Sequence, residues 1–253
     1  MHPPASLHIA LIVLSGAVGA WVGFRLLLLA KRTRKGPEFQ VGTALISWSL
    51  LGQPLALCLG PLSGSLGSEV LELSYTGYWL SWVIVYTGLA FFCRSVFDTG
   101  RSRLRGILFG LSWMPGAIAW CVIVVLGTSA GPVPEAICNL TCTVGFGWSG
   151  TEALLYWKKL RRRQTLGLAD PVVTNRFLLW GSCCVATSPI AFWVFTLAIQ
   201  GYGLGSGYAP AEFATSIGGL LNTAVWLLTF VPPRWYVHFV RRRTDLSETA
   251  HSS

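Results

Sequence analysis

The feature that most constrains this chain is a series of seven long apolar runs separated by short polar connections. The runs cover residues 6–30, 40–59, 74–97, 106–126, 134–157, 171–200 and 210–239. A bilayer core about 30 Å thick is crossed by a helix of about 20 apolar residues. Only 11% of the 253 residues are charged, whereas soluble domains carry roughly 25%. The sequence therefore predicts an all-α, multi-pass membrane protein with a seven-transmembrane-helix bundle over residues 1–240.

The basic residues predict how the bundle is oriented. All nineteen Lys and Arg lie at alternate helix ends, in the groups 25–35, 94–105, 158–163 with Arg176, and 234–243. The opposite ends carry only acids, at Glu69, Glu72, Glu135 and Glu212. Cytoplasmic loops carry the excess of Lys and Arg. We therefore expect the N-terminus outside, and the C-terminus with a basic and polar tail, residues 241–253, in the cytoplasm.

The net charge of +9 does not indicate a nucleic-acid partner, because the basic residues lie at the helix ends. Orientation signals and anionic lipid headgroups at the cytoplasmic face account for it. The first apolar run is expected to remain as helix one, because its basic residues follow it, whereas those of a signal peptide come before. The expected partners are the lipid bilayer, those headgroups and a small apolar ligand.

Proline marks two helix boundaries. Asp170 precedes Pro171, and an acidic N-cap followed by proline is typical of a helix start. Pro232 and Pro233 remove two backbone donors and are expected to kink or end the last helix. The aromatic and basic residues 234–239 that follow suit the headgroup layer. This segment is interpreted as an interfacial anchor or, as the alternative, a partner-binding tail.

Two stretches of the chain have the same order of features. Residues 26–57 run from an apolar segment through a basic cluster to a second apolar segment with Gln53 and Pro54. Residues 154–191 repeat this order and contain Ser188 and Pro189. Such similarity is consistent with a 3+1+3 parallel repeat of the kind found in some transporters. The alternative is that any membrane helix followed by positive charge gives this pattern.

Polar residues within the runs are the natural candidates for a site, since they are expensive in lipid. Glu152 lies about two turns before Lys158, so it is either part of a salt bridge near the inner surface or a proton-linked group. Gln53 and Asn222 fall in helices two and seven. Such residues either join helices through hydrogen bonds or share a binding site.

Tryptophan is unusually frequent, with twelve residues. Several lie deep within the runs, where the enrichment of tryptophan at membrane interfaces does not explain them. Core packing is one explanation, and a pocket for an apolar ligand is the other. As a hypothesis, Trp82, Trp193, Asn222 and Trp226 face one interior cavity. Asn222 and Trp226 are one helical turn apart and so share a face.

Several kinds of chemistry are not indicated. The four lysines all lie at cytoplasmic ends, so none reaches mid-membrane to form a Schiff base. His8 and His238 belong to opposite faces and cannot bind one haem together. The sequence contains no HExxH, GxSxG or phosphate-binding loop. The seven cysteines are expected to pack as small apolar residues, with a disulfide or metal at Cys138 and Cys142 as a minor alternative. We expect no metal, cofactor or enzymatic activity.

Residues 167–181, GLADPVVTNRFLLWG, and residues 230–236, FVPPRWY, resemble an uncharacterised group of seven-helix bacterial membrane proteins. This resemblance implies the bacterial inner (plasma) membrane and supplies no function. The chain also resembles microbial rhodopsins in helix number and orientation. The shared features are Tyr78-Trp79-Leu80, Pro189 with Trp193, and Asn222 with Trp226. In that alignment Trp226 replaces the retinal lysine and both carboxylates are lost, which implies a rhodopsin-like fold without retinal-linked pumping.

Three functions remain open on this reading. The first is a receptor-like or sensory protein that binds a small apolar ligand within the bundle and signals through its basic face. The second is a small transporter or channel, whose topology resembles that of the SWEET sugar transporters, with Gln53–Pro54 where they have Pro–Gln. The third is a structural membrane subunit. The deep tryptophans favour the first, and the proline-interrupted helices favour the second.

Overall fold

The computed structural model describes residues 5–34, 36–97, 103–202 and 209–251, which are almost entirely helical. This confirms the all-α prediction. The main helices of the bundle are α1 (Ala5–Thr33), α2 (Gly36–Ser47), α4 (Ser68–Phe97), α7 (Pro132–Gln164), α8 (Pro171–Ile199) and α9 (Ala209–Phe230), followed by α10 (Arg234–His251). The remaining elements are η1 (Trp48–Gly52), α3 (Gln53–Leu59), η2 (Ser63–Ser65), α5 (Arg103–Leu111), α6 (Met114–Leu126) and η3 (Gly127–Ala130).

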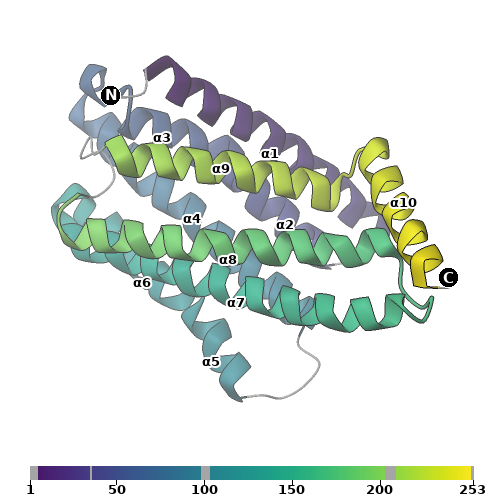
Figure 1. Ribbon diagram of the computed structural model, residues 1–253. Coiled ribbons are helices and arrows are strands. Elements are labelled where there is room, and N and C mark those ends of the chain that lie inside the picture. Colours follow the sequence, from purple (N-terminus) through teal and green to yellow (C-terminus); the bar gives the residue numbers. More distant parts are fainter. Residues whose placement is uncertain (1–4, 35, 98–102, 203–208, 252–253) are drawn as a thin grey trace.

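The long helices form a closed ring in chain order. Helix α1 packs against α2, α2 against α4, α4 against α7, α7 against α8, α8 against α9, and α9 returns to α1. The α5–α6 pair lies outside this ring, against α4 and α7. Figure 1 shows the termini at opposite ends of the bundle and α10 lying across one end.

Among the described residues, five helical stretches are long and apolar enough to cross a membrane, which indicates a membrane protein. They are Ile9–Thr33, Gly36–Leu59, Ser68–Phe97, Arg103–Ala130 and Pro171–Ile199. In α9, the apolar helical segment found among the described residues is Gly218–Phe230, which is shorter than these five. Helix α7 has sufficient length, but its sequence carries many polar residues.

The position of α7 explains why it can be polar. It contacts α4, α5, α6 and α8, so most of its surface faces protein. Glu135, Asn139, Thr141 and Glu152 on this helix are all buried. Polar groups at membrane depth are tolerated where they face other helices and find partners there. An apolar run was predicted at 134–157 from sequence, and the helix extends beyond it at both ends.

Three predicted helices are interrupted in the structure. The second contains a π-helical turn, η1, directly before Gln53 and Pro54. The fourth is broken after Leu111, and Trp113 has the non-helical backbone angles φ −146° and ψ −38°. The seventh was expected over 210–239 as one helix, but α9 ends at Phe230 and α10 begins at Arg234. Pro232 and Pro233 cause this last break, because they cannot donate the helical hydrogen bonds.

The predicted basic and polar tail, residues 241–253, is helical as far as it is described. Helix α10 continues through His251, so this basic segment belongs to a helix that starts directly after the two prolines. At the other predicted boundary, the carboxylate of Asp170 accepts a hydrogen bond from the backbone N–H of Val172 at 2.7 Å. This confirms Asp170 as the N-cap of α8.

Facing glycines join the helices of two hairpins. A Cβ built at Gly23 would lie 3.1 Å from the carbonyl oxygen of Gly42, and the reverse distance is also 3.1 Å. At Gly150 and Gly181 the two corresponding distances are 2.9 and 3.0 Å. Small residues allow helix backbones to approach closely in membranes. The two helices of the α1–α2 hairpin and those of the α7–α8 hairpin therefore approach closely for the same reason, a pair of facing glycines.

The bundle interior is filled mainly by aromatic side chains. One continuous cluster includes Tyr86, Phe92, Phe97, Trp148 and Trp180 among its buried members. A second, at the end of the bundle where α3 ends, is built on Leu59, Tyr75, Trp79, Ala119, Ile123 and Cys138. A third, small cluster joins α10 to α8 through Val172, Tyr236 and Val240.

Candidate functional site

Trp82 lies where α4 faces the π-helical turn η1. Its ring centroid is 4.4 Å from that of Trp48 in η1 and 6.4 Å from that of Phe146 in α7. Tyr78, one turn earlier on α4, packs edge-on against Trp48 at 5.9 Å. Aromatic rings attract one another at these separations. We call Trp48, Tyr78, Trp82 and Phe146 the aromatic junction, because three helices meet there.

Two serine hydroxyls, one in the π-helical turn and one directly before it, are unpaired in the described part of the chain. Among the described residues, the buried hydroxyls of Ser47 and Ser49 have no hydrogen-bond partner. A serine in a regular α-helix can bond the carbonyl four residues earlier. Gln53 follows directly, is 6% exposed and lies beside Gly16 of α1. π-helical turns are frequent at functional sites, so this segment is a candidate site.

Asn222 joins α9 to α8 through hydrogen bonds. Its amide nitrogen donates to the hydroxyl of Thr187 at 2.9 Å and to the carbonyl of Gly218 at 2.9 Å. Its amide oxygen accepts from the thiol of Cys183 at 2.8 Å. A buried asparagine must pair in this way to avoid a large cost in apolar surroundings. Its polar atoms are therefore occupied by helix-to-helix bonds in this structure.

The structure does not bring the four residues of the predicted cavity together. Trp82 and Trp226 both pack against the large aromatic cluster. Asn222 is directed at α8. Trp193 is 37% exposed and lies on the outer surface of the bundle. Pro189 lies inside α8 as predicted, but the side chain of Trp193 one turn later does not enter the interior.

A buried carboxylate lies at the end of the bundle opposite α10. Glu135, in the first turn of α7, is 6% exposed, and the hydroxyl of Tyr75 on α4 donates to its carboxylate at 3.3 Å. Trp79 packs edge-on against Tyr75, with centroids 6.4 Å apart. The indole nitrogen of Trp79 is buried and has no hydrogen-bond partner in the described part of the chain. From sequence, Glu135 was interpreted as an acid at the outer end of a helix, in its first turn, and not as part of a buried contact.

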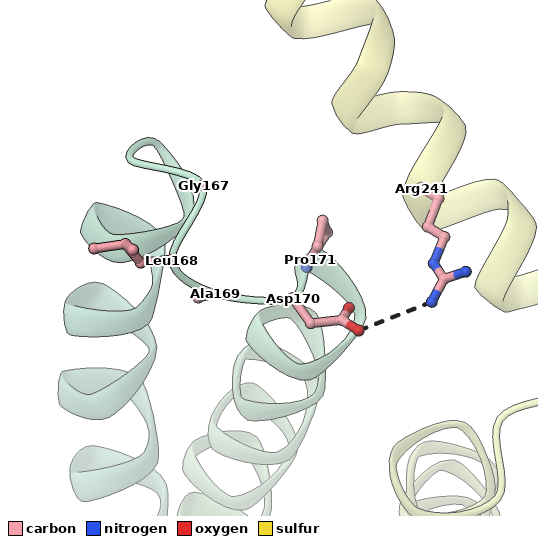
Figure 2. A pocket seen from close by; sticks show the side chains of 6 residues that line it. All are labelled: Gly167, Leu168, Ala169, Asp170, Pro171 and Arg241. Carbon is pink, nitrogen blue, oxygen red and sulfur yellow. Dashed lines mark ion pairs between the residues drawn. The ribbon is translucent and has the colours of Figure 1, made fainter.

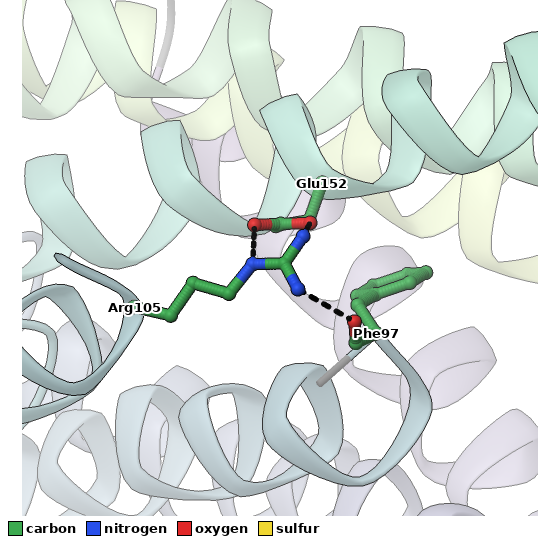
Figure 3. A network of polar contacts seen from close by, with 3 residues as sticks. All are labelled: Phe97, Arg105 and Glu152. Atoms are coloured by element: carbon green, nitrogen blue, oxygen red, sulfur yellow. Dashed lines mark hydrogen bonds and ion pairs between the residues drawn. The ribbon is translucent and has the colours of Figure 1, made fainter. Parts of the chain in front are cut away.

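An ion pair lies towards the other end of the bundle. Arg105 on α5 donates from Nε to one oxygen of Glu152 at 3.0 Å and from Nη2 to the other at 3.1 Å. Its third nitrogen, Nη1, reaches the carbonyl of Phe97 at the end of α4, at 3.4 Å (Figure 3). Of the two alternatives for Glu152, the structure contains the salt bridge, with Arg105 as its partner. The pair joins α4, α5 and α7.

This ion pair is well placed to be strong. The side chain of Glu152 is 11% exposed and that of Arg105 is 28% exposed. Two parallel hydrogen bonds between a guanidinium and a carboxylate add both energy and a fixed geometry. Breaking such a pair leaves one buried charge without compensation, which costs far more than losing an exposed salt bridge. The link therefore favours one arrangement of α5 relative to α7.

A shallow open recess lies between the α7–α8 connection and α10. Gly167, Leu168, Ala169, Asp170, Pro171 and Arg241 line it (Figure 2). The guanidinium of Arg241 is 3.9 Å from the carboxylate of Asp170, and both side chains are largely exposed. Nearby, Asn175 of α8 donates to the hydroxyl of Tyr236 at 2.6 Å. Burial raises the pKa of Tyr236 above its ordinary value, and the hydrogen bond from Asn175 opposes this rise.

The sequence did not predict the contacts that Tyr75, Trp79, Arg105 and Trp48 make. Tyr75 and Trp79 have a helical spacing of four residues, a signal that they share one face. Arg105 gave no such signal, because it is one of several arginines in a basic group.

All seven cysteines are free thiols. In the described ranges no three potential metal ligands come together. No protein-family model, curated protein or solved structure matches this chain.

Proposed function

We propose that this chain is a receptor-like membrane protein that binds a small apolar ligand at the aromatic junction and signals through its basic end. The observation that carries the proposal is the contact of Trp48 in η1 with Trp82 on α4, at 4.4 Å. Sites for small ligands combine apolar walls with a few polar groups. The aromatic rings supply the walls, and the unpaired hydroxyls of Ser47 and Ser49 supply polar groups.

The π-helical turn gives this site a means of response. A π-helical turn contains one more residue per turn than the α-helical path around it. A ligand that separates Trp48 from Trp82 would favour a shift between η1 and α4. Phe146 of the aromatic junction lies on the same helix as Glu152. Movement of α7 would strain the bidentate bonds between Glu152 and Arg105, and so reach the end of the bundle that carries the basic groups.

The topology belongs to the same proposal. We infer seven spans, made of α1, α2–α3, α4, α5–α6, α7, α8 and α9, with the N-terminus outside. Support comes from the closed ring of helices in chain order and from the basic groups at alternate helix ends. The rhodopsin-like packing rests on the sequence resemblance alone. A bacterial inner-membrane location rests on the sequence resemblance alone.

A fluorescent apolar probe tests the ligand site. Protein in nanodiscs is titrated with 1-aminoanthracene, and bound probe is measured against empty nanodiscs. Trp82→Ala and Trp48→Ala should each weaken saturable binding by at least tenfold, because each removes one wall of the site. Trp193→Ala, the replacement of an exposed tryptophan, is the matched control and should leave binding unchanged. Equal affinities in all three variants, or no saturable binding, would contradict the proposal.

A small transporter is the second candidate. The observation in its favour is that two predicted spans contain an internal proline, Pro54 directly after the π-helical turn η1 and Pro189 inside α8. Interrupted helices in corresponding halves often mark the substrate sites of transporters. The paired glycines of the α1–α2 and α7–α8 hairpins agree with the proposed repeat. Uptake of a labelled sugar into sealed proteoliposomes, absent from empty liposomes, would favour this candidate over the receptor.

A further inference from the structure

Among the described elements, helix α10 stands out as a long helix that does not run along the bundle. It begins after Pro233 and lies across the end of the bundle where α1 and α7 also end (Figure 1). One face of it is docked on the bundle. Tyr236 and Val240, one turn apart, are 6% and 9% exposed and pack with Val172 of α8. The hydrogen bond from Asn175 to Tyr236 fixes this contact.

The undocked surface of α10 has two different flanks. Trp235 and Phe239 are one turn apart and are 65% and 60% exposed. Residues at this spacing lie on one face of a helix. Arg234 and Arg241, seven residues apart, share another exposed face. The helix therefore presents an aromatic flank beside a basic flank, and neither is covered within the described residues.

We infer that this surface of α10 lies in the headgroup layer of the same membrane and binds anionic phospholipids. The aromatic flank would enter the boundary between headgroups and acyl chains, where Trp and Phe of amphipathic helices insert. The basic flank would pair with the phosphates. Helix α10 lies at the end of the bundle where α1 and α7 carry their basic groups, so charge complementarity favours anionic lipid over a basic partner.

The weak ion pair of Arg241 leaves it available for this role. Its guanidinium is 3.9 Å from Asp170, and the side chains are 61% and 46% exposed. Exposed pairs of this kind contribute little to stability. A phosphate group can therefore replace Asp170 at Arg241 without breaking a strong interaction (Figure 2). The inference depends on the chain being in a membrane and not on the proposed apolar ligand.

Hydrogen–deuterium exchange of the full chain tests the inference. The chain is placed in nanodiscs of phosphatidylcholine, or of phosphatidylcholine with one-fifth phosphatidylglycerol. Both leaflets of a disc have the same composition, so the result does not depend on the topology. Amides of residues 234–251 should exchange at least fivefold more slowly in the anionic discs, because each arginine near an anionic surface contributes about a fivefold preference. High salt should remove the difference, since it screens these charges.

Two double variants separate the contributions of the flanks. Arg241→Gln with Arg242→Gln should remove the lipid dependence, and Trp235→Ser with Phe239→Ser should speed exchange in both kinds of disc. Arg162→Gln with Arg163→Gln is the matched control, because it removes the same charge from exposed positions of α7. Equal exchange in neutral and anionic discs would overturn the inference. So would loss of the effect in the control, or protection found only in discs that hold two copies of the chain.

Discussion

At the residue scale, the interior is defined by a few polar groups that find partners across helices. Glu152 is bound by Arg105, Asn222 by Thr187 and Cys183. Each lies in an apolar run of the sequence, where an unpaired polar group would be costly. Through these contacts, the polar residues link one helix to another. The unpaired hydroxyls of Ser47 and Ser49 are the contrast, and they are the polar groups of the proposed site.

Breaking the ion pair should destabilise the protein strongly. Glu152→Gln or Arg105→Gln leaves one charge buried without its partner, a change that costs about 3–5 kcal/mol in soluble proteins. The double variant should recover part of this loss, because it leaves neither charge behind. Arg103→Gln, on the exposed side of α5, is the control. Thermal unfolding in detergent measures all four, and single variants as stable as the control would show that the pair contributes nothing.

Trp226 and Trp193 should respond differently to truncation. Trp226 packs against the large aromatic cluster, so Trp226→Ala leaves a void and should cost up to about 3–5 kcal/mol. Trp193 is 37% exposed, and Trp193→Ala should cost clearly less. The melting temperatures of the two variants without ligand give the comparison. A larger loss for Trp193→Ala would mean that this side chain, and not Trp226, lies in the packed interior.

At the element scale, close helix pairs depend on glycine. The α7–α8 pair meets where Gly150 faces Gly181, and a Cβ at Gly150 would lie 2.8 Å from the backbone nitrogen of Val185. Backbone atoms cannot move aside as the end of a flexible side chain can. The basic turns and their prolines decide where these helices begin and end, whereas the glycines decide how near they come.

Adding one methyl group at this interface should therefore force the helices apart. Gly150→Ala and Gly181→Ala should each cost about 1–3 kcal/mol, the usual range for overpacking. Gly106→Ala on α5 is the control, because a Cβ there meets nothing within 4 Å and alanine favours helix. Thermal unfolding with circular dichroism distinguishes them. If alanine at 150 and 181 is as well tolerated as at 106, the close approach of α7 and α8 is not set by glycine.

At the scale of the whole molecule, the ring of helices in chain order fits short connections between neighbours. Each helix of the ring contacts the next in the series α1, α2, α4, α7, α8 and α9, and α9 closes the ring on α1. Such local packing is expected for a bundle whose connections are short. It also places α5 and α6 outside the ring, where only one side is covered by protein. The apolar surface of α6, which includes Val122, Val124 and Val125, would then face lipid.

Reporter fusions test the proposed topology. Insertions in the connection at 63–67 and in that at 201–207 should both report from outside the cytoplasm, because neither contains a basic residue. Part of the second connection lies outside the described residues, so its position is a prediction from sequence only. An insertion at 165–168, after the basic group of α7, is the control and should report from the cytoplasm. A cytoplasmic signal from either of the first two would contradict seven spans.

The sequence alone determined the helical class, the approximate extent of most helices and the N-cap at Asp170. These features depend on local properties, namely apolar length, proline and capping chemistry, which act within a few residues. It also identified Glu152, Gln53 and Asn222 as buried polar groups, because their cost in lipid is a property of the residue itself. Seven spans and their orientation remain predictions from the same local signals.

Only the tertiary structure decided which residues meet. The pairing of Glu152 with Arg105 and the stacking of Trp82 on Trp48 join residues that are far apart in the sequence. Periodicity in this chain could not show which side of a helix faces protein, because lipid and protein interior are both apolar. Trp193 was assigned to the interior for that reason, and the structure places it on the surface.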